Sequence, residues 1–218
     1  MYNTCMGTIS ALSRIALAAI AFSLVSCGFN TSVVSLDYQP MLGQALPGPR
    51  VVEVGRFADF RRLGEFSLGT VHTPFGTPLE TINTRVPVAN VVRNAFAHGL
   101  SARKMLAPSE TAQFILTGEV LEFECQQRVH PSSFASVRVN LVRVGSGEIV
   151  FSRVYQSARE SDAYMPGSGS PVPNLRDLAS RALQNVVDRA LDDRVLRSRL
   201  TDSTSPASNS RRAPDAPL

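Results

Sequence analysis

The chain has 218 residues, of which 44% are hydrophobic and 18% are charged, and its formal net charge is +4. This composition is typical of a globular protein and excludes collagen-like and wholly disordered chains, and the length suffices for one domain with a sizeable core. The arginine excess forms no basic run long enough to predict nucleic-acid binding, and it supports at most a slight attraction to anionic lipid.

The N-terminal segment has the order of residues typical of a secretory signal. Arg14 supplies a positive charge, residues 15–24 are almost wholly apolar, and the small Ser26 ends the series. An apolar core of about ten residues is too short for a transmembrane helix, which needs about 20. Residues 1–26 are therefore interpreted as a cleaved signal peptide. A plain secretory signal and an uncleaved anchor are the alternatives.

Cys27 follows this segment directly, and residues 24–27 read Leu-Val-Ser-Cys, which resembles the lipobox of bacterial lipoproteins. The resemblance implies that Cys27 becomes the first mature residue and carries a diacylglycerol thioether and usually a third acyl chain. Two or three chains make membrane attachment effectively permanent. Gly28 stands where an aspartate would favour the inner membrane, which implies the periplasmic face of the outer membrane without excluding the inner one. Translation that begins at Met1 and translation that begins at Met6 would both give a complete signal peptide.

The cysteine content predicts no disulfide framework. Cys5 and Cys27 belong to the signal and the anchor, which leaves Cys125 alone in the mature domain. The acidic neighbour Glu124 disfavours the thiolate that a reactive cysteine requires, and free cysteines are among the most buried residues. Cys125 is therefore predicted to be a structural thiol. A nucleophile or an intermolecular disulfide partner is the alternative.

Composition divides the mature chain into three parts. Residues 27–32 are a lipidated tether, residues 33–200 are predicted to form a single α+β domain, and the Ser-, Pro-, Ala- and Arg-rich residues 201–218 are predicted to be a disordered tail. Strand-like runs are predicted at 33–38, 51–57, 113–125, 134–144 and 148–157. The segment 66–85 is rich in Gly, Thr and Pro and is predicted to be a long loop or a flexible hairpin.

The last two strand-like runs are predicted to be antiparallel neighbours, because Gly145-Ser146-Gly147 between them is a tight-hairpin signal. Alternation along the first of these runs divides its residues between two faces. The predicted inward residues are Val137, Val139, Leu141 and Val144, and the predicted outward residues are Arg138, Asn140 and Arg143. The sheet is thus predicted to have a polar outer face.

Two helices are predicted from apolar residues at helical spacing. The first runs from Pro87 to about Met105, with proline at the first helical position. The second begins with Asn174 as its N-cap and Asp177 in its first turn, and continues to Leu191.

The order and spacing of these elements resemble a known group of proteins. The matching stretches are Cys27, residues 35–40, 51–62, 88–95 and 112–120, the Gly147 hairpin and the closing helix. The chain resembles small envelope lipoproteins of the YajG type and the auxiliary lipoproteins of ABC-type lipid transporters. The resemblance implies an α+β fold with a mixed or antiparallel sheet of about five strands, two helices packed on one face, a membrane tether and no cofactor.

The residues available for catalysis form no convergent site. His72, His98 and His130 lack metal-ligand spacing. A Ser-His-Asp triad stays open because its members need not be close in sequence, but there is no Gly-x-Ser-x-Gly elbow. The carboxylates of Glu122 and Glu124 are explained by one solvent-facing strand edge. The sequence therefore predicts no enzyme, no metal site and no cofactor.

Two functions remain. The first is a non-enzymatic accessory in outer-membrane assembly or lipid transport, which docks on an envelope protein complex while lipid on Cys27 holds it at the membrane. The second is a periplasmic module that binds lipid or glycan in an apolar groove. The polar outer face favours docking, and the oligomeric state stays open. The candidate contact residues are Phe66, Val71, Phe75, Leu79 and Ile82. The alternative is that these side chains only cover the sheet edge.

Overall fold

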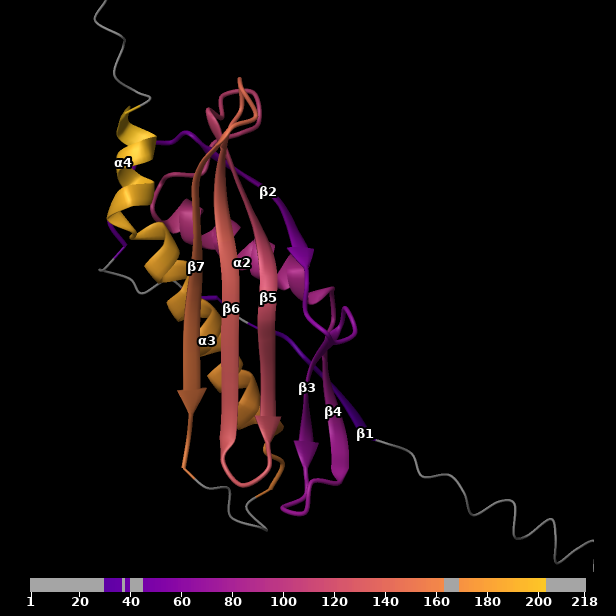
Figure 1. The fold of residues 1–218 in the computed structure, drawn as a ribbon. Helices are drawn as coiled ribbons and strands as arrows, with labels where there is room; N and C mark the ends of the chain where they lie inside the picture. The colour runs from indigo at the N-terminus through magenta and orange to yellow at the C-terminus, as the bar shows by residue number, and fades with distance from the viewer. Residues whose placement is uncertain (1–29, 37, 40–44, 163–168, 203–218) are drawn as a thin grey trace, which may run out of the picture. The chain divides into compact units, whose positions relative to one another are not determined.

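The computed structural model describes residues 30–36, 38–39, 45–162 and 169–202 (Figure 1). The fold is α+β with a seven-stranded open sheet in the order β1-β4-β3-β5-β6-β7, and β2 also pairs with β5. The strands are β1 Asn30–Val34, β2 Val52–Asp59, β3 Ser67–His72, β4 Pro78–Thr84, β5 Phe114–Gln127, β6 Pro131–Arg143 and β7 Ile149–Glu160. The helices are α2 Val88–Ala102, α3 Val172–Leu191 and α4 Arg194–Asp202.

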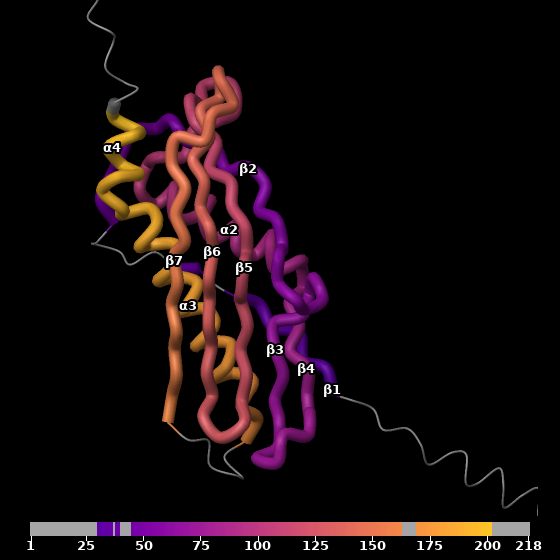
Figure 2. Tube along the Cα trace, in the orientation of Figure 1, coloured from indigo at the N-terminus to yellow at the C-terminus, as the bar shows by residue number. Residues whose placement is uncertain are grey.

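Strand β5 is the centre of the sheet, and two strands share one of its edges. Its first half pairs in parallel with β2, starting at Val52 opposite Phe114. Its last residues pair in parallel with β3, ending at Val71 opposite Gln127. Its other edge pairs with the antiparallel β6 along its whole length. Figure 2 shows β2 and β3 following one another along the edge of β5 that lies opposite β6.

The helices α2 and α3 lie on one face of the sheet, where α3 packs on β6 and β7 and α2 packs on β2 and α3 (Figure 1). This follows from alternation, because most of the inward-facing residues of β5 and β6 are apolar and point to the helices. Side chains of this layer that are fully buried include Phe114, Leu116, Val137, Val139, Leu141, Leu175 and Leu183. The core therefore lies between the sheet and α3, as the apolar stripe of that helix predicts.

The sheet has two more strands than predicted, because residues 66–85 form β3 and β4 as an antiparallel pair. The hairpin alternative for this segment is therefore the correct one. The register of the pair shifts between Ser67 and Gly69 and again between Val71 and His72. These irregularities interrupt the alternation by which a strand is recognised in a sequence.

The chain ends of the domain also differ from the prediction. Strand β1 begins at Asn30 and ends at Val34, so it uses part of the predicted tether. Helix α4 is a third helix that extends to Asp202, two residues into the predicted tail. It begins there because Asp193 accepts hydrogen bonds from the backbone N–H groups of Val195 at 2.8 Å and Leu196 at 3.2 Å. Residues 203–218 lie outside the described part of the chain.

Three smaller expectations are corrected. Pro87 precedes the first residue of α2, and α3 begins at Val172 after Pro171 rather than at an Asn174 cap. The Asn174 amide instead donates to the Ser161 hydroxyl at 2.9 Å. Val144 is exposed instead of facing inward, because it lies three positions after the inward-facing Leu141 and successive strand residues point to opposite faces. The other inward residues of β6 are buried as predicted.

Candidate functional site

Cys27 and the signal segment lie outside the described residues, so the lipidation of Cys27 stays a prediction. Within the described ranges, no helix is both long and apolar enough to cross a membrane. An attachment at Cys27 would reach the domain through a short segment, since β1 begins three residues later.

Cys125 is a buried structural thiol, as predicted. The side chain is 1% exposed on the inner face of β5, and burial together with the neighbouring Glu124 carboxylate raises the pKa of the thiol to about 12. It therefore stays protonated and shielded at neutral pH.

We expect Cys125 to resist alkylation in the folded protein, since only an exposed thiolate reacts readily. Iodoacetamide should modify this position at least about tenfold more slowly in buffer than in concentrated urea. Peptide mapping by mass spectrometry measures both rates. Equal rates at pH 8 would contradict the burial of Cys125.

The three histidines lie apart, on separate elements. His72 is half-buried on β3, and His98 is exposed on α2. His130 is exposed beside β6, with its Nδ1 3.9 Å from a carboxylate oxygen of Glu160. Among residues 30–36, 38–39, 45–162 and 169–202, no three His, Cys, Asp or Glu side chains gather as a metal site would require.

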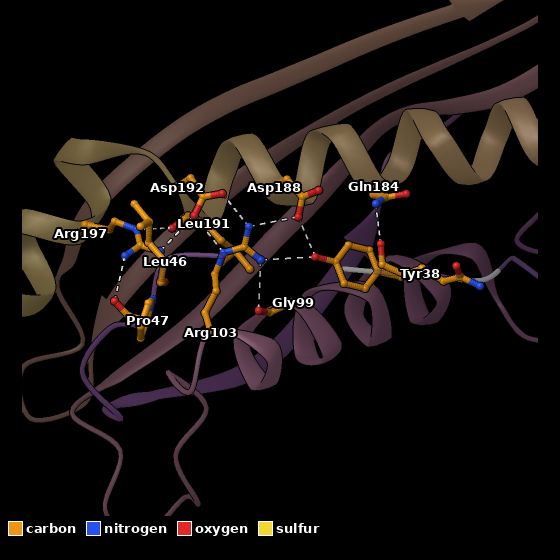
Figure 3. Close-up of polar contacts among 11 residues, drawn as sticks. Tyr38, Leu46, Pro47, Gly99, Arg103, Gln184, Asp188, Leu191, Asp192 and Arg197 are labelled. Carbon is orange, nitrogen blue, oxygen red and sulfur yellow. Dashed lines mark hydrogen bonds and ion pairs between the residues drawn. The ribbon is translucent and has the colours of Figure 1, made fainter. Parts of the chain in front are cut away.

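The most extensive polar cluster surrounds Arg103 at the C-terminal end of α2 (Figure 3). The Arg103 side chain is 2% exposed. The guanidinium binds both carboxylate oxygens of Asp192, at 2.9 and 2.6 Å, and an oxygen of Asp188 at 3.1 Å. It also donates to the Gly99 carbonyl at 3.3 Å and to the Tyr38 hydroxyl at 3.4 Å. Its hydrogen-bonding capacity is thus used within the protein.

The Arg103 cluster ties the segment before β2 to α3 and α4. The Tyr38 hydroxyl donates to Asp188 at 2.7 Å, and burial together with this bond raises the pKa of Tyr38 to about 12. Arg197 binds Asp192 at 3.0 Å and the Leu46 carbonyl at 2.6 Å. Because charged groups in it are paired with one another, the cluster is a structural clamp rather than a binding site.

A groove of about 440 Å³ lies beside Tyr38, between residues 34–36 on one side and the helices α2 and α3 on the other. Val34, Val91 and Leu183 supply apolar walls, and His98 adds a polar group. Its volume is within the range of small-molecule sites, about 300 to 1,000 Å³. The groove is one place in the described structure that matches the predicted groove between sheet and helices.

The predicted contact residues of segment 66–85 divide into two groups. Val71 and Ile82 are buried in the core, so the covering interpretation is correct for them. Phe66, Phe75 and Leu79 are exposed, so they are available for contact. The sequence could not separate the groups, because the register shifts of the β3–β4 pair decide which side chains turn inward.

Phe66 is one of four exposed apolar side chains in or beside the loop between β2 and β3. We call this group the apolar loop patch; it consists of Phe60, Leu63, Phe66 and Val86. The loop meets the segment after β4, because Thr84 donates from its backbone N–H to the Phe66 carbonyl at 2.8 Å and from its hydroxyl to the Val86 carbonyl at 2.7 Å. Several exposed apolar side chains on one loop are typical of a contact site.

Arg61 fixes the loop from within. Its side chain is 2% exposed and pairs with both carboxylate oxygens of Asp59 at 2.9 Å. It also donates to the carbonyls of Ser67 at 2.7 Å and Phe123 at 3.0 Å. The guanidinium fork thereby holds the loop against β3 and β5. The sequence did not indicate this role, since the acceptors on β3 and β5 are backbone carbonyl groups.

The outer face of β5, β6 and β7 carries the polar side chains of Arg138 and Asn140, as predicted. Arg143, also predicted to face outward, is paired with the inward-facing Phe114 and so belongs to the helix-facing side of β6, where it is exposed at the end of the strand. Arg138 pairs with Glu119 across the β5–β6 ladder. The Ser152 hydroxyl donates to the Asn140 side chain at 2.7 Å across the β6–β7 ladder. Glu122 and Glu124 also belong to this face of β5, which agrees with the predicted solvent-facing edge.

Comparison with known proteins gives likenesses of fold. No family model and no curated protein matches the chain. The crystal structure of protein XCC0632 from Xanthomonas campestris, described under the family model DUF330, is similar with a TM-score of 0.59 at 14% identity, covering 81% of this chain and 100% of that one. An uncharacterised protein is similar with a TM-score of 0.49 at 12% identity, covering 74% and 97%.

A minor lipoprotein from Acinetobacter baumannii is similar with a TM-score of 0.38 at 10% identity, covering 62% of this chain and 96% of that one. At such identities a likeness concerns the fold alone. The chain thus shares the fold of the DUF330 protein XCC0632 over that protein's whole length.

Proposed function

We propose that this protein is a lipid-anchored envelope lipoprotein, held at the periplasmic face of the outer membrane through Cys27, that acts without catalysis as an accessory in outer-membrane assembly or lipid transport. The lipobox-like residues 24–27 support the lipid anchor. The fold shared with XCC0632 supports the architecture of the domain. The docking role rests on the apolar loop patch.

The apolar loop patch has the properties of a protein contact site. Its members are 38 to 63% exposed, and Arg61 holds their loop in one conformation, so little conformational entropy is lost when a partner binds. Two of the four are phenylalanines, and aromatic residues are enriched where interfaces concentrate their binding energy. The partner is therefore expected to be a protein with an apolar recess, within an envelope complex.

The test is site-specific photo-cross-linking in cells, with the photoreactive residue at Leu63. We expect a membrane complex to be captured there and identified by mass spectrometry. Val195 on α4 is the matched control, since its exposure of 42% is close to the 38% of Leu63. A Phe60→Ser variant should reduce capture about thirtyfold, which corresponds to one interface hot spot. The Val195→Ser variant should not reduce it.

Two outcomes would contradict this function. Equal capture from Leu63 and Val195 would show that the apolar loop patch does not select a partner. A Cys27→Ala variant that is still processed and fractionates unchanged with membranes would contradict the anchor. With the anchor correct, this variant should become soluble in the periplasm or remain an unprocessed precursor.

The groove beside Tyr38 favours a second function, a lipid- or glycan-binding module. Its mixture of apolar walls with His98 and Asn94 suits a ligand that has both apolar and polar parts. Extraction of the purified protein followed by mass spectrometry of lipids and glycans tests this function. A ligand recovered from the protein, and lost when Leu36→Trp narrows the groove, would favour it over docking.

A further inference from the structure

The turn between β3 and β4 displays Phe75 almost completely to solvent. Its side chain is 97% exposed, more than any other large apolar side chain in the described residues. The turn is ordered: Gly76 donates to the Thr73 carbonyl at 2.9 Å, and Thr73 donates to the Thr77 carbonyl at 2.8 Å. Gly76 has φ of +87°, which a glycine adopts without strain. The backbone of the turn therefore keeps Phe75 on the outside of the domain.

The turn that carries Phe75 lacks charge, and further exposed apolar side chains lie at the same end of the sheet. Residues 73–79 carry no ionisable side chain. Leu79 follows on β4 with 51% exposure. Val129, 54% exposed, lies in the turn between β5 and β6, and the parallel pairing of β3 with β5 brings both turns to the same end of the sheet. Figure 1 shows the two turns at this end.

The beginning of β1 lies at this same end. Ser32 donates to the carboxylate of Glu80, near the start of β4. Val34 lines the groove together with Thr84, the last residue of β4. Strand β1 therefore runs in the direction of β4 and begins beside the β3–β4 turn, as Figure 1 also shows.

Chain connectivity relates the predicted anchor to this end. Thr31 follows Cys27 by four residues. Four residues span at most about 14 Å when fully extended, and less in any other conformation. A lipid on Cys27 thus holds Thr31, and with it the beginning of β1, within about 14 Å of its own position.

We infer that the β3–β4 turn, residues 73–79, inserts Phe75 and Leu79 into the interfacial layer of the membrane to which the lipid on Cys27 is attached. An uncharged apolar tip loses little by leaving water, and it gains by burying its apolar surface among lipid chains. Arg128, exposed in the adjacent turn beside Val129, lies where it can reach lipid phosphates while its stem stays with the apolar tip.

The contact orients the domain. A lipid at a single point lets the domain rotate, whereas a second contact at the same end fixes the sheet with its β6–β7 turn farthest from the membrane. The inference rests on the proposed anchor, and it adds an orientation that the anchor alone does not define.

The test uses the full lipidated protein in vesicles of phosphatidylethanolamine and phosphatidylglycerol. A fluorophore is attached at Thr77→Cys, a position whose backbone rather than side chain holds the turn. The parallel sample carries it at Ser146→Cys, in the β6–β7 turn at the other end of the sheet. Flotation measures attachment, and quenching by lipids with a doxyl group on the acyl chain measures insertion.

We expect both samples to float and only the Thr77→Cys probe to be quenched. Adding Phe75→Ser should lower the ratio of inserted to exposed probe about tenfold, which is the effect of one aromatic side chain. Val144→Ser, which removes an exposed apolar side chain at the other end, should leave the ratio unchanged. Because Phe75 is 97% exposed, its substitution should not change the thermal midpoint.

The remaining outcomes overturn the inference. Protein that floats with both probes unquenched would contradict the membrane contact alone and leave the anchor intact. Protein that does not float would contradict the anchor and the contact together. A Thr77→Cys probe that is shielded only when envelope proteins are added would assign the turn to a protein partner instead.

Discussion

The Arg103→Met variant is expected to lose about 3 kcal/mol of unfolding free energy, because it leaves the carboxylates of Asp188 and Asp192 without their buried cation. Breaking a buried ion pair typically costs about 3 to 5 kcal/mol. The lower end applies here, since these carboxylates are 20% and 32% exposed and keep the partners Tyr38 and Arg197. Urea unfolding followed by circular dichroism measures the loss.

The exposed pair of Arg176 and Asp177 provides the matched control. These side chains are 47% and 55% exposed, and exposed pairs contribute at most about 1 kcal/mol. Arg176→Met should therefore change stability by less than about 0.5 kcal/mol. The loss of unfolding free energy in Arg103→Lys should lie between those of Arg103→Met and Arg176→Met. Lysine keeps the charge but lacks the planar guanidinium that binds both oxygens of Asp192. Similar midpoints for Arg103→Met and Arg176→Met would show that the Arg103 cluster is not a clamp.

The sequence predicted the parts of the fold that depend on local periodicity. The α3 helix was recognisable because Leu175, Ala179 and Ala182 belong to a long apolar stripe, and its fully buried face is the one predicted. The alternation of β6 placed Val137 and Val139 inward, which is also confirmed. Such patterns depend on neighbours within a few positions.

The Arg103 cluster could not be predicted, since the partners Asp188 and Asp192 lie 85 and 89 residues away. Nothing local separates Arg103 from a solvated arginine at a helix end. The exposure of Phe75 could not be predicted either, because an apolar residue in a Pro- and Gly-containing segment can be buried or exposed. Contacts between distant segments decide both cases, and only the folded structure contains them.

The Gly69→Ala variant is expected to lose about 3 kcal/mol or more, because β3 approaches β5 too closely for a side chain. A Cβ atom at Gly69 would lie 1.7 Å from the Cys125 carbonyl oxygen and 2.7 Å from its carbonyl carbon. These are backbone atoms, so no side-chain rotation relieves the clash and β3 must move away from β5. The expected cost follows from overpacking, which typically amounts to about 1 to 3 kcal/mol and exceeds this where backbone must shift.

Gly145→Ala is the control with the same chemical change. A Cβ at Gly145 meets no atom within 4 Å, so we expect a change below about 0.5 kcal/mol. Thermal and urea midpoints of the two variants separate the effect of close approach from that of losing a glycine. Gly69→Ala should also speed alkylation of Cys125, because β3 pairs with β5 at only three positions, one of them Gly69 opposite Cys125. Equal midpoints with Cys125 still protected would mean that β3 does not lie against β5 as the sheet order requires.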